Sequence, residues 1–256
     1  MILTINVSNS NVTLAGFSQN ALTFSAQIHT ELAKSADEYA VQISSVLQLY
    51  GHSTASVEGV ILSCVVPALL SCLQKAVRHF FTKRIYVVGP GLKTGLSIQT
   101  DNPAQMGSEI VCCAVAALQN NAAPCLLIAM DTAISIALLD ANGALRGGVL
   151  APGVKIGADA LCARTAQLSQ VDLCAPIAGV IGTNTDACVR AGIVLGTACM
   201  LDGMIDLFCT AANTMLTVLA TGEIAPVILS HCSHTIAYHE NLIHTGLFAL
   251  YQKNAK

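Results

Sequence analysis

The chain has 256 residues, of which 54% are hydrophobic and only 11% are charged, and its net charge is −3. This length can bury one large core or two smaller ones, and the absence of a long basic run gives nucleic-acid binding no electrostatic support, so we expect no nucleic-acid partner. A surface so poor in charge suggests that a large subunit interface covers part of it, and we therefore expect a homodimer.

The sequence gives no sign of a targeting or membrane segment. Residues 1–6 lack the basic stretch of a signal peptide, and the most apolar run, Gly59 to Leu73, is interrupted by Pro67 and is shorter than the ~20 residues of a membrane helix. We expect a cytoplasmic protein with no membrane partner. Its 11 cysteines form no CxxC pair and are interpreted as small buried hydrophobes. The histidines between 231 and 244 could bind zinc, but their spacing is more typical of ordinary loop and helix residues.

The first half begins with a strand, a polar turn and two more strands. Apolar residues 2–5 lead into the polar residues 6–11, then strands are predicted at 12–17 and 21–27. Further predicted elements are a helix over 35–49 that begins at Ser35-Ala36-Asp37-Glu38, buried strands over 60–66 and 85–88, and a helix over 107–119.

The second half repeats this order. Apolar residues 125–128 meet the polar turn Asp131-Thr132-Ala133, strands follow at 134–139 and 145–150, and Asn142-Gly143 between them is a hairpin signal. Helices are predicted over 157–166 and 186–208, with a buried strand over 216–220. The repetition predicts a duplicated α/β fold of two similar domains around a cleft, residues 1–118 and 119–256, with the boundary in the turn that starts at Gln119.

Each half therefore has a polar turn between its first two strands. Such turns can offer backbone N–H groups and hydroxyls to phosphate, so two of them facing one cleft could hold a nucleotide. Turns rich in serine and asparagine are also common without any ligand.

Several longer motifs occur in a fixed order. They are Val87-Val88-Gly89-Pro90-Gly91-Leu92-Lys93-Thr94-Gly95-Leu96, Asp101-Asn102-Pro103, Ser35-Ala36-Asp37-Glu38-Tyr39, Ser63-Cys64-Val65-Val66-Pro67, Gly147 to Gly153, Arg164-Thr165-Ala166, Ile181 to Thr185, Ala220-Thr221-Gly222, and Gly246-Leu247 with Tyr251 and Asn254. Together they resemble the type III pantothenate kinases over nearly the whole chain.

The resemblance implies a function. Members of this family have the duplicated fold of actin and the sugar kinases (ribonuclease H-like), and transfer the γ-phosphoryl group of ATP to the 4′-hydroxyl of pantothenate, the first step of coenzyme A synthesis. It also implies a homodimer, Mg²⁺ and a monovalent cation, K⁺ or NH₄⁺. The ATP-binding residues that it implies are Asn6, Val7, Ser8, Asn9, Ser10, Asn11, Val12, Thr13 and Thr132. The substrate-binding residues that it implies are Gly107, Ser108, Glu109, Ile110 and Thr185, with Glu109 as the catalytic carboxylate.

Several residues depart from the family pattern. The first turn, DxGNT in the family, begins here with Asn6 and has Ser8 at the glycine. The second, DFGTAT, has Ala129 at the acid, so no metal ligand is certain. Asp131 is either a substitute ligand or an ordinary turn residue. In place of GADR stand Gly107-Ser108-Glu109-Ile110.

Glu109 keeps the carboxylate, although a charge in the first turn of a helix also suits the helix dipole without any catalysis. Ile110 cannot bind a carboxylate as arginine does.

Two hypotheses follow. The first is a divergent pantothenate kinase whose activity is weak or lost, because missing charges aimed at phosphates cost orders of magnitude in rate. The alternative is a catalytically inactive dimeric family member with a binding or regulatory role, similar to an accessory factor of transcription.

Overall fold

The computed structural model describes residues 1–255 and divides the chain into two compact units. The first unit contains Met1–Leu96, Asp101–Asn120 and the chain from Asn241 onward, and the second contains Ser97–Thr100 and Asn121–Glu240. The expected division was a single boundary after residue 118, whereas Ser97–Thr100 belongs to the second unit. The last helix differs from the expectation, because it packs with the first unit.

The first unit is built on a five-stranded sheet of order β3-β2-β1-β4-β5. β1 pairs antiparallel with β2 and parallel with β4, and the outer pairs are β2 with β3, antiparallel, and β4 with β5, parallel. Its elements are β1 (Ile2–Val7), β2 (Asn11–Ser18), β3 (Ala21–His29), α1 (Ala36–Leu49), a 3-10 turn (Thr54–Ser56), β4 (Gly59–Cys64), α2 (Pro67–Arg78), β5 (Ile85–Val87), a 3-10 turn (Pro103–Gln105), α3 (Ser108–Gln119) and α7 (Leu242–Asn254).

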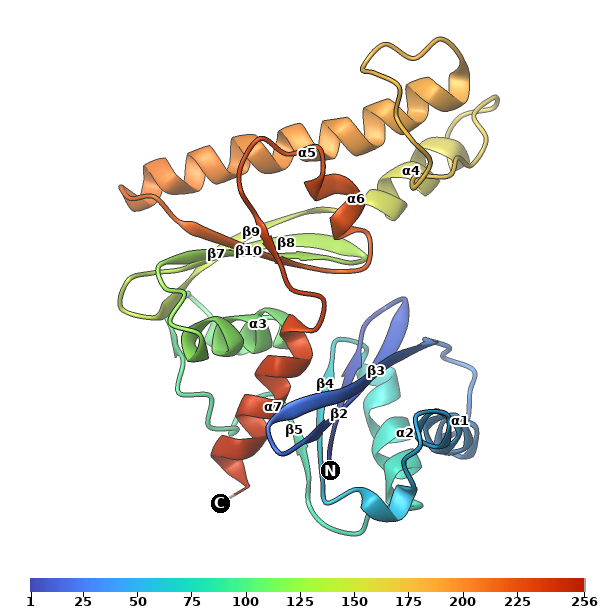
Figure 1. Cartoon of the computed structure of the whole chain (residues 1–256), viewed down its shortest axis with the longest axis vertical. Coiled ribbons are helices and arrows are strands. Elements are labelled where there is room, and N and C mark those ends of the chain that lie inside the picture. The colour runs from blue at the N-terminus through green and yellow to red at the C-terminus, as the bar shows by residue number, and fades with distance from the viewer. Residues whose placement is uncertain (256) are drawn as a thin grey trace. The chain divides into compact units, whose positions relative to one another are not determined.

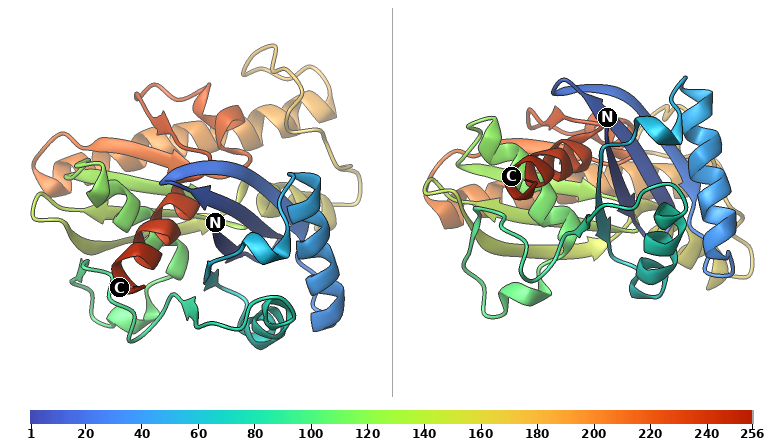
Figure 2. Two further views of the ribbon diagram at one scale, coloured as in Figure 1. Left: turned by 60° about the horizontal axis from the view of Figure 1, so that its bottom comes forward. Right: turned by 90° about the horizontal axis from the view of Figure 1, so that it is seen from below.

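The two faces of this sheet differ in character because successive side chains of a strand point to opposite sides. Leu3, Ile5 and Val7 of β1 are fully buried in an apolar core shared with α1 and α2. Thr4 and Asn6 point to the other face, where α7 lies, with α3 beside it (Figures 1 and 2). The sheet thus has an apolar face and a face with buried polar groups.

Helix α1 begins where the sequence predicts it. Ser35 is the N-cap: its Oγ accepts a hydrogen bond from the Glu38 backbone N–H at 3.3 Å, and the Glu38 carboxylate accepts one from the Ser35 N–H at 2.7 Å. This reciprocal capping box satisfies two N–H groups that the helix itself cannot pair.

The second unit has a six-stranded sheet of order β11-β10-β7-β8-β9-β6. Its strands β9-β8-β7-β10-β11 repeat the order and the directions of the first sheet, and β6 is added at the β9 edge. The duplicated fold is therefore confirmed. The elements are β6 (Ser97–Ile98), β7 (Cys125–Met130), β8 (Ala133–Leu139), β9 (Ala144–Pro152), α4 (Val154–Ala163), α5 (Thr185–Ala212), β10 (Thr217–Thr221), α6 (Ala225–Leu229) and β11 (Ala237–Tyr238).

Helix α5 runs along this second sheet (Figure 1). Four of its buried residues recur every three or four positions and join the core of the unit: Val194, Ala198, Leu201 and Ile205. Among residues 1–255, α5 is also the one helix that is long and apolar enough to span a membrane by length and composition. The core helix of a soluble protein meets the same criteria, and the stripe of buried residues accounts for the apolar character of one face.

Several expectations need correction. The helix expected over 157–166 begins three residues earlier, at Val154, and α2 and α7 were not expected. Helix α3 is buried from Ile110 through Ala117. Of the cysteines, Cys112, Cys113 and Cys125 are buried, whereas the others are partly or fully exposed. Burial raises the pKa of Cys125 to about 12, which keeps this thiol neutral.

Candidate active site

The candidate site lies in the first unit, at the carboxyl ends of β1 and β4. These parallel strands place Asn6 beside Ser63 in register. The carboxyl edge of a sheet is where open α/β folds bind ligands. The β1–β2 turn and the first residues of α3 meet at the same edge, so the residues expected to carry the chemistry of this half lie together.

Asn6 and Glu109 form the central contact of this site. The Asn6 side chain is buried, with 4% exposure, and its Nδ2 donates a hydrogen bond to Glu109 Oε1 over 2.9 Å. Only this orientation of the amide is favourable, because the reverse would place two oxygens against each other. Glu109 stands in the first turn of α3, where the positive end of the helix dipole favours a carboxylate.

A second contact fixes the start of α3. Ser63 Oγ, from β4, donates to Ser108 Oγ over 2.8 Å, and Gly107 is the N-cap residue of the helix. The backbone that carries Glu109 is therefore tied to β4, and its side chain is tied to β1.

One polar atom of the site has no partner within residues 1–255. Asn6 Oδ1 is buried and accepts no hydrogen bond. A buried acceptor left unpaired costs about 1–3 kcal/mol, so native proteins rarely keep one without a reason. A ligand donor or a cation at this position would satisfy it.

The β1–β2 turn is closed by Ser8. Its buried Oγ donates to the Asn11 carbonyl over 3.0 Å, and Asn9 and Ser10 at the tip are exposed. The exposed tip is the part of the turn that a phosphate can reach. Val7 belongs to the apolar core.

Two other residues of the expected nucleotide set are also engaged inside the unit. Val12 lies in the same apolar core, and Thr13 Oγ1 contacts the imidazole of His244. Their side chains are therefore not directed at a nucleotide.

His244 of α7 is a buried residue that sequence reasoning missed as part of this face. Its Nδ1 lies 2.8 Å from Thr4 Oγ1 and its Nε2 lies 2.9 Å from Thr13 Oγ1. Because Thr4 donates its own hydrogen to the Ala15 carbonyl, its oxygen accepts from Nδ1–H, and Nε2 accepts from Thr13. Burial lowers the pKa of His244 to about 4, so the ring is neutral at neutral pH.

The second unit carries the other expected turn. Asp131 and Thr132 connect β7 to β8, Asp131 is exposed, and Ala129 is buried in β7. A methyl group on Gly153 would overlap the carbonyl oxygens of both turn residues, and one on Gly222 would overlap that of Met130. Because these two residues are glycines, their backbone can pack directly against the backbone of this turn. Asp131 is the acidic residue of the turn.

The remaining expected substrate residues are placed as follows. Ile110 is buried, with 7% exposure, and Thr185 is exposed at the start of α5, where Asn184 Oδ1 caps the helix by accepting from the Ala187 N–H at 2.9 Å. Gly107 and Ser108 lie beside Glu109, at the candidate site.

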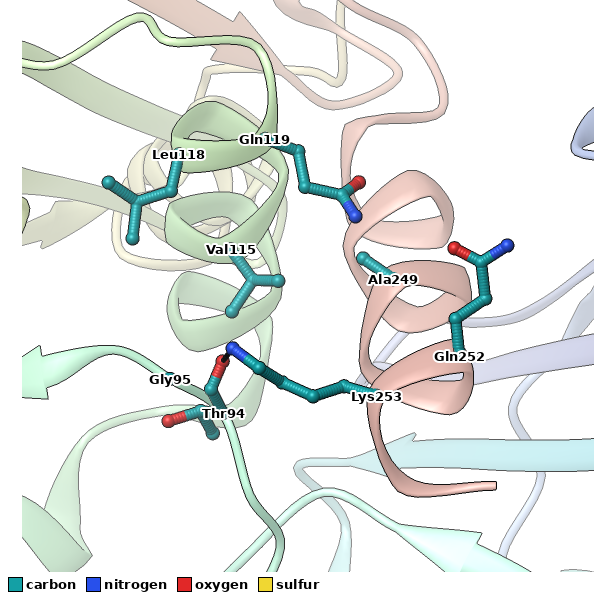
Figure 3. Close-up of a pocket in the computed structure, with 8 residues that line it drawn as sticks. All are labelled: Thr94, Gly95, Val115, Leu118, Gln119, Ala249, Gln252 and Lys253. Atoms are coloured by element: carbon teal, nitrogen blue, oxygen red, sulfur yellow. Dashed lines mark hydrogen bonds between the residues drawn. The ribbon is translucent and has the colours of Figure 1, made fainter. Parts of the chain in front are cut away.

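The long motif Val87–Leu96 holds the C-terminal helix in place. Asn254 accepts a hydrogen bond from the Lys93 N–H and donates one to the Lys93 carbonyl, at 3.0 and 2.9 Å. Lys253 Nζ donates to the Thr94 carbonyl over 3.0 Å, across a pocket of about 640 Å³ between α3 and α7 (Figure 3). These hydrogen bonds connect the motif at Lys93 and Thr94 to Lys253 and Asn254 near the C-terminus.

Comparison with known proteins identifies the family. The family model described as type III pantothenate kinase matches residues 2–207. The type III pantothenate kinase of Syntrophobacter fumaroxidans is 34% identical over 256 residues, covering 100% of this chain and 99% of that protein. That of Geobacillus thermodenitrificans is 32% identical over 256 residues, with the same coverage. The chain belongs to the type III pantothenate kinase family.

Solved structures agree on the fold. Component A of the (R)-2-hydroxyglutaryl-CoA dehydratase of Acidaminococcus fermentans has a TM-score of 0.58 at 13% identity, covering 100% of this chain and 99% of that one. A glucokinase from an Antarctic psychrotroph has a TM-score of 0.50 at 11% identity, covering 98% of each chain. At these identities the likeness concerns the fold alone, which is the duplicated actin-like and sugar-kinase-like fold.

The candidate site has few oxygen donors for a metal. Among residues 1–255, no three His, Cys, Asp or Glu side chains gather as a metal site. The candidate site at the end of β1 offers the Glu109 carboxylate and the unpartnered Asn6 Oδ1. Mg²⁺ commonly keeps several waters and binds through one or two carboxylates plus substrate phosphates, so these residues fit an ion that arrives with the nucleotide.

Proposed function

We propose that this protein phosphorylates pantothenate with ATP, giving 4′-phosphopantothenate in the first step of coenzyme A biosynthesis. The observation that carries the proposal is the family match over the full chain, combined with a carboxylate held in place where the family pattern has its catalytic acid. Glu109 supplies that carboxylate through its hydrogen bond to buried Asn6.

Each part of the site has a distinct role in this proposal. Glu109 accepts the proton of the attacking 4′-hydroxyl and orients its oxygen toward the γ-phosphorus. The exposed tip of the β1–β2 turn, Asn9 and Ser10, is the part of the turn that contacts the phosphates. Mg²⁺, when bound, neutralises charge on the phosphates, and Asn6 Oδ1 or Glu109 is the protein oxygen that would face it.

The replaced residues predict a slow enzyme. An amide at Asn6 and a methyl at Ala129 bring no negative charge to a cation, and buried Ile110 offers no partner for the pantothenate carboxylate. We therefore expect weak Mg²⁺ binding without nucleotide and a high KM for pantothenate, rather than a change of reaction.

We further propose that the enzyme is a cytoplasmic homodimer, with neither nucleic acid nor membrane as a partner. The low charge content supports a covered surface, as does an exposed apolar side chain on α5, Leu207, which is 64% exposed. The monovalent cation follows from the family resemblance, so activity is to be measured with K⁺, with NH₄⁺ and with neither.

The decisive experiment compares three proteins in a coupled ADP-release assay with pantothenate and Mg-ATP: the parent, Glu109→Gln and Glu31→Gln. General-base assistance is typically worth ~10²–10⁴-fold, so Glu109→Gln should lose about that factor in kcat. Its amide carbonyl can still accept the hydrogen bond from Asn6, which keeps the local structure. Glu31→Gln removes an exposed carboxylate of the same unit and should leave kcat unchanged.

The outcome also separates the two hypotheses. Turnover by the parent and by Glu31→Gln that is lost in Glu109→Gln supports the pantothenate kinase hypothesis. No turnover in the parent at high pantothenate and ATP would instead favour the catalytically inactive, regulatory alternative.

A further inference from the structure

The contact between Asn6 and Glu109 has a chemical consequence that depends on the amide. Nδ2 of Asn6 donates to Glu109 Oε1 over 2.9 Å, in a place that excludes water from Asn6. A carboxylate at position 6, as the family pattern has, could not donate this hydrogen bond. It would instead place a second negative charge beside Glu109, and two carboxylates so close share a proton to higher pH.

Contacts from two strands hold the backbone and the side chain of Glu109. The Ser63–Ser108 hydrogen bond fixes the first turn of α3 to β4, and thereby the Glu109 backbone. The glutamate side chain still has three rotatable bonds, one more than the aspartate of the family pattern. Asn6, inflexible in its buried strand position, selects among the orientations that these bonds allow.

We propose that Asn6 is a positioning residue, which holds the Glu109 carboxylate in its reactive orientation through Nδ2. The inference rests on the proposed kinase function. Two departures from the family pattern, asparagine for aspartate at position 6 and glutamate for aspartate at position 109, are then one coupled change. The longer side chain of Glu109 reaches β1, and the Asn6 amide donates a hydrogen bond to it. Asn6 Oδ1, the other polar atom of the amide, is buried and has no hydrogen-bond partner within residues 1–255.

Four variants test the proposal by steady-state kinetics over pH 6 to 9 and by thermal unfolding. Asn6→Asp removes the donor and adds a like charge. Asn6→Ala removes the donor alone. Asn6→Asp combined with Glu109→Gln restores the hydrogen bond with donor and acceptor exchanged. Asn20→Asp, at an exposed asparagine that accepts a hydrogen bond from Gln252, is the matched control.

The expected results separate positioning from a merely structural role. Misplacing a reacting group by about 1 Å can cost ~10²-fold, so Asn6→Ala should lower kcat by roughly 10- to 100-fold while KM for pantothenate changes little. Asn6→Asp should lose as much at pH 7 and recover part of it at higher pH, with the acid limb of the kcat profile moved up by about one pH unit or more. The double variant should regain the melting temperature of the parent but keep the low turnover of Glu109→Gln.

Other results would overturn the proposal. An Asn6→Asp enzyme with unchanged or raised kcat and an unmoved acid limb would show that the site lacks an acid rather than needing the amide. A double variant with parent turnover would show that catalysis does not need the Glu109 carboxylate that Asn6 is proposed to position. A parent without turnover overturns the proposed function itself, and this role with it, before any variant is compared.

Discussion

The buried imidazole of His244 predicts a specific loss of stability at mildly acidic pH. The ring lies between Thr4 and Thr13 and has a pKa of about 4, lowered by burial. In the unfolded chain the same group has a pKa of about 6.5. The unfolded state therefore takes up a proton below pH 6.5, whereas the folded state does so only near pH 4.

The sign and the size follow from this difference. The contribution of neutral His244 to the free energy of unfolding is fully present above pH 6.5 and falls as the pH drops from 6.5 to 4. Below pH 4 this group causes no further loss. Each pH unit is worth about 1.4 kcal/mol, so the full loss is on the order of 3 kcal/mol. That is a large fraction of the ~5–15 kcal/mol by which domains are usually stable.

Urea unfolding at half-unit steps between pH 7.5 and 4 measures this contribution when the parent is compared with His244→Gln, which cannot take up a proton in this range. The stability advantage of the parent over the variant should shrink by on the order of 3 kcal/mol from pH 7 to pH 4. His29→Gln, at an exposed histidine, is the matched control and should not reproduce this dependence. A difference between the parent and His244→Gln that stays constant over this pH range would refute the reasoning.

Three further predictions concern the scaffold. Ser35→Ala removes the capping box of α1 and should lower the free energy of unfolding by ~1 kcal/mol, measured by urea titration; a change below a few tenths would mean that the cap is redundant. Gly153→Ala should displace the turn at Asp131 and weaken nucleotide binding in calorimetry, whereas Gly196→Ala, which meets open space on α5, should bind nucleotide normally and gain ~0.5–1 kcal/mol in stability. Light scattering should give the mass of a dimer, and a stable monomer at micromolar concentration would contradict the proposed assembly.

The sequence predicts the elements of the fold where the signal is local. The strand, polar turn and strand pattern is visible in both halves because the buried strands are continuous apolar runs bounded by polar turns. The start of α1 is equally readable, since Ser35 and Glu38 form the capping box within four residues. Helix α2, which was not predicted, also has a local signal for a helix. Pro67 stands in its first turn, and buried Leu69 and Leu73 are at helical spacing.

The contacts that define the candidate site carry no such local signal. Asn6 and Glu109 are 103 positions apart in the chain, and His244 and Thr4 are 240 apart. Nothing in the spacing of residues 241–254 indicates that α7 covers the polar face of the first sheet. The residue types at the site were expected from the motifs, whereas their pairing required the structure.

The most direct test of the central claim is the chemical identity of the product. Purified protein, pantothenate and Mg-ATP labelled in the γ-phosphoryl group are incubated together, and the product is identified by mass spectrometry and phosphorus NMR. We predict label on the 4′-hydroxyl oxygen of pantothenate, formed by the parent and by Glu31→Gln but reduced by ~10²-fold or more in Glu109→Gln. Label that appears only as inorganic phosphate, or equal amounts of labelled pantothenate from all three proteins, would contradict the account.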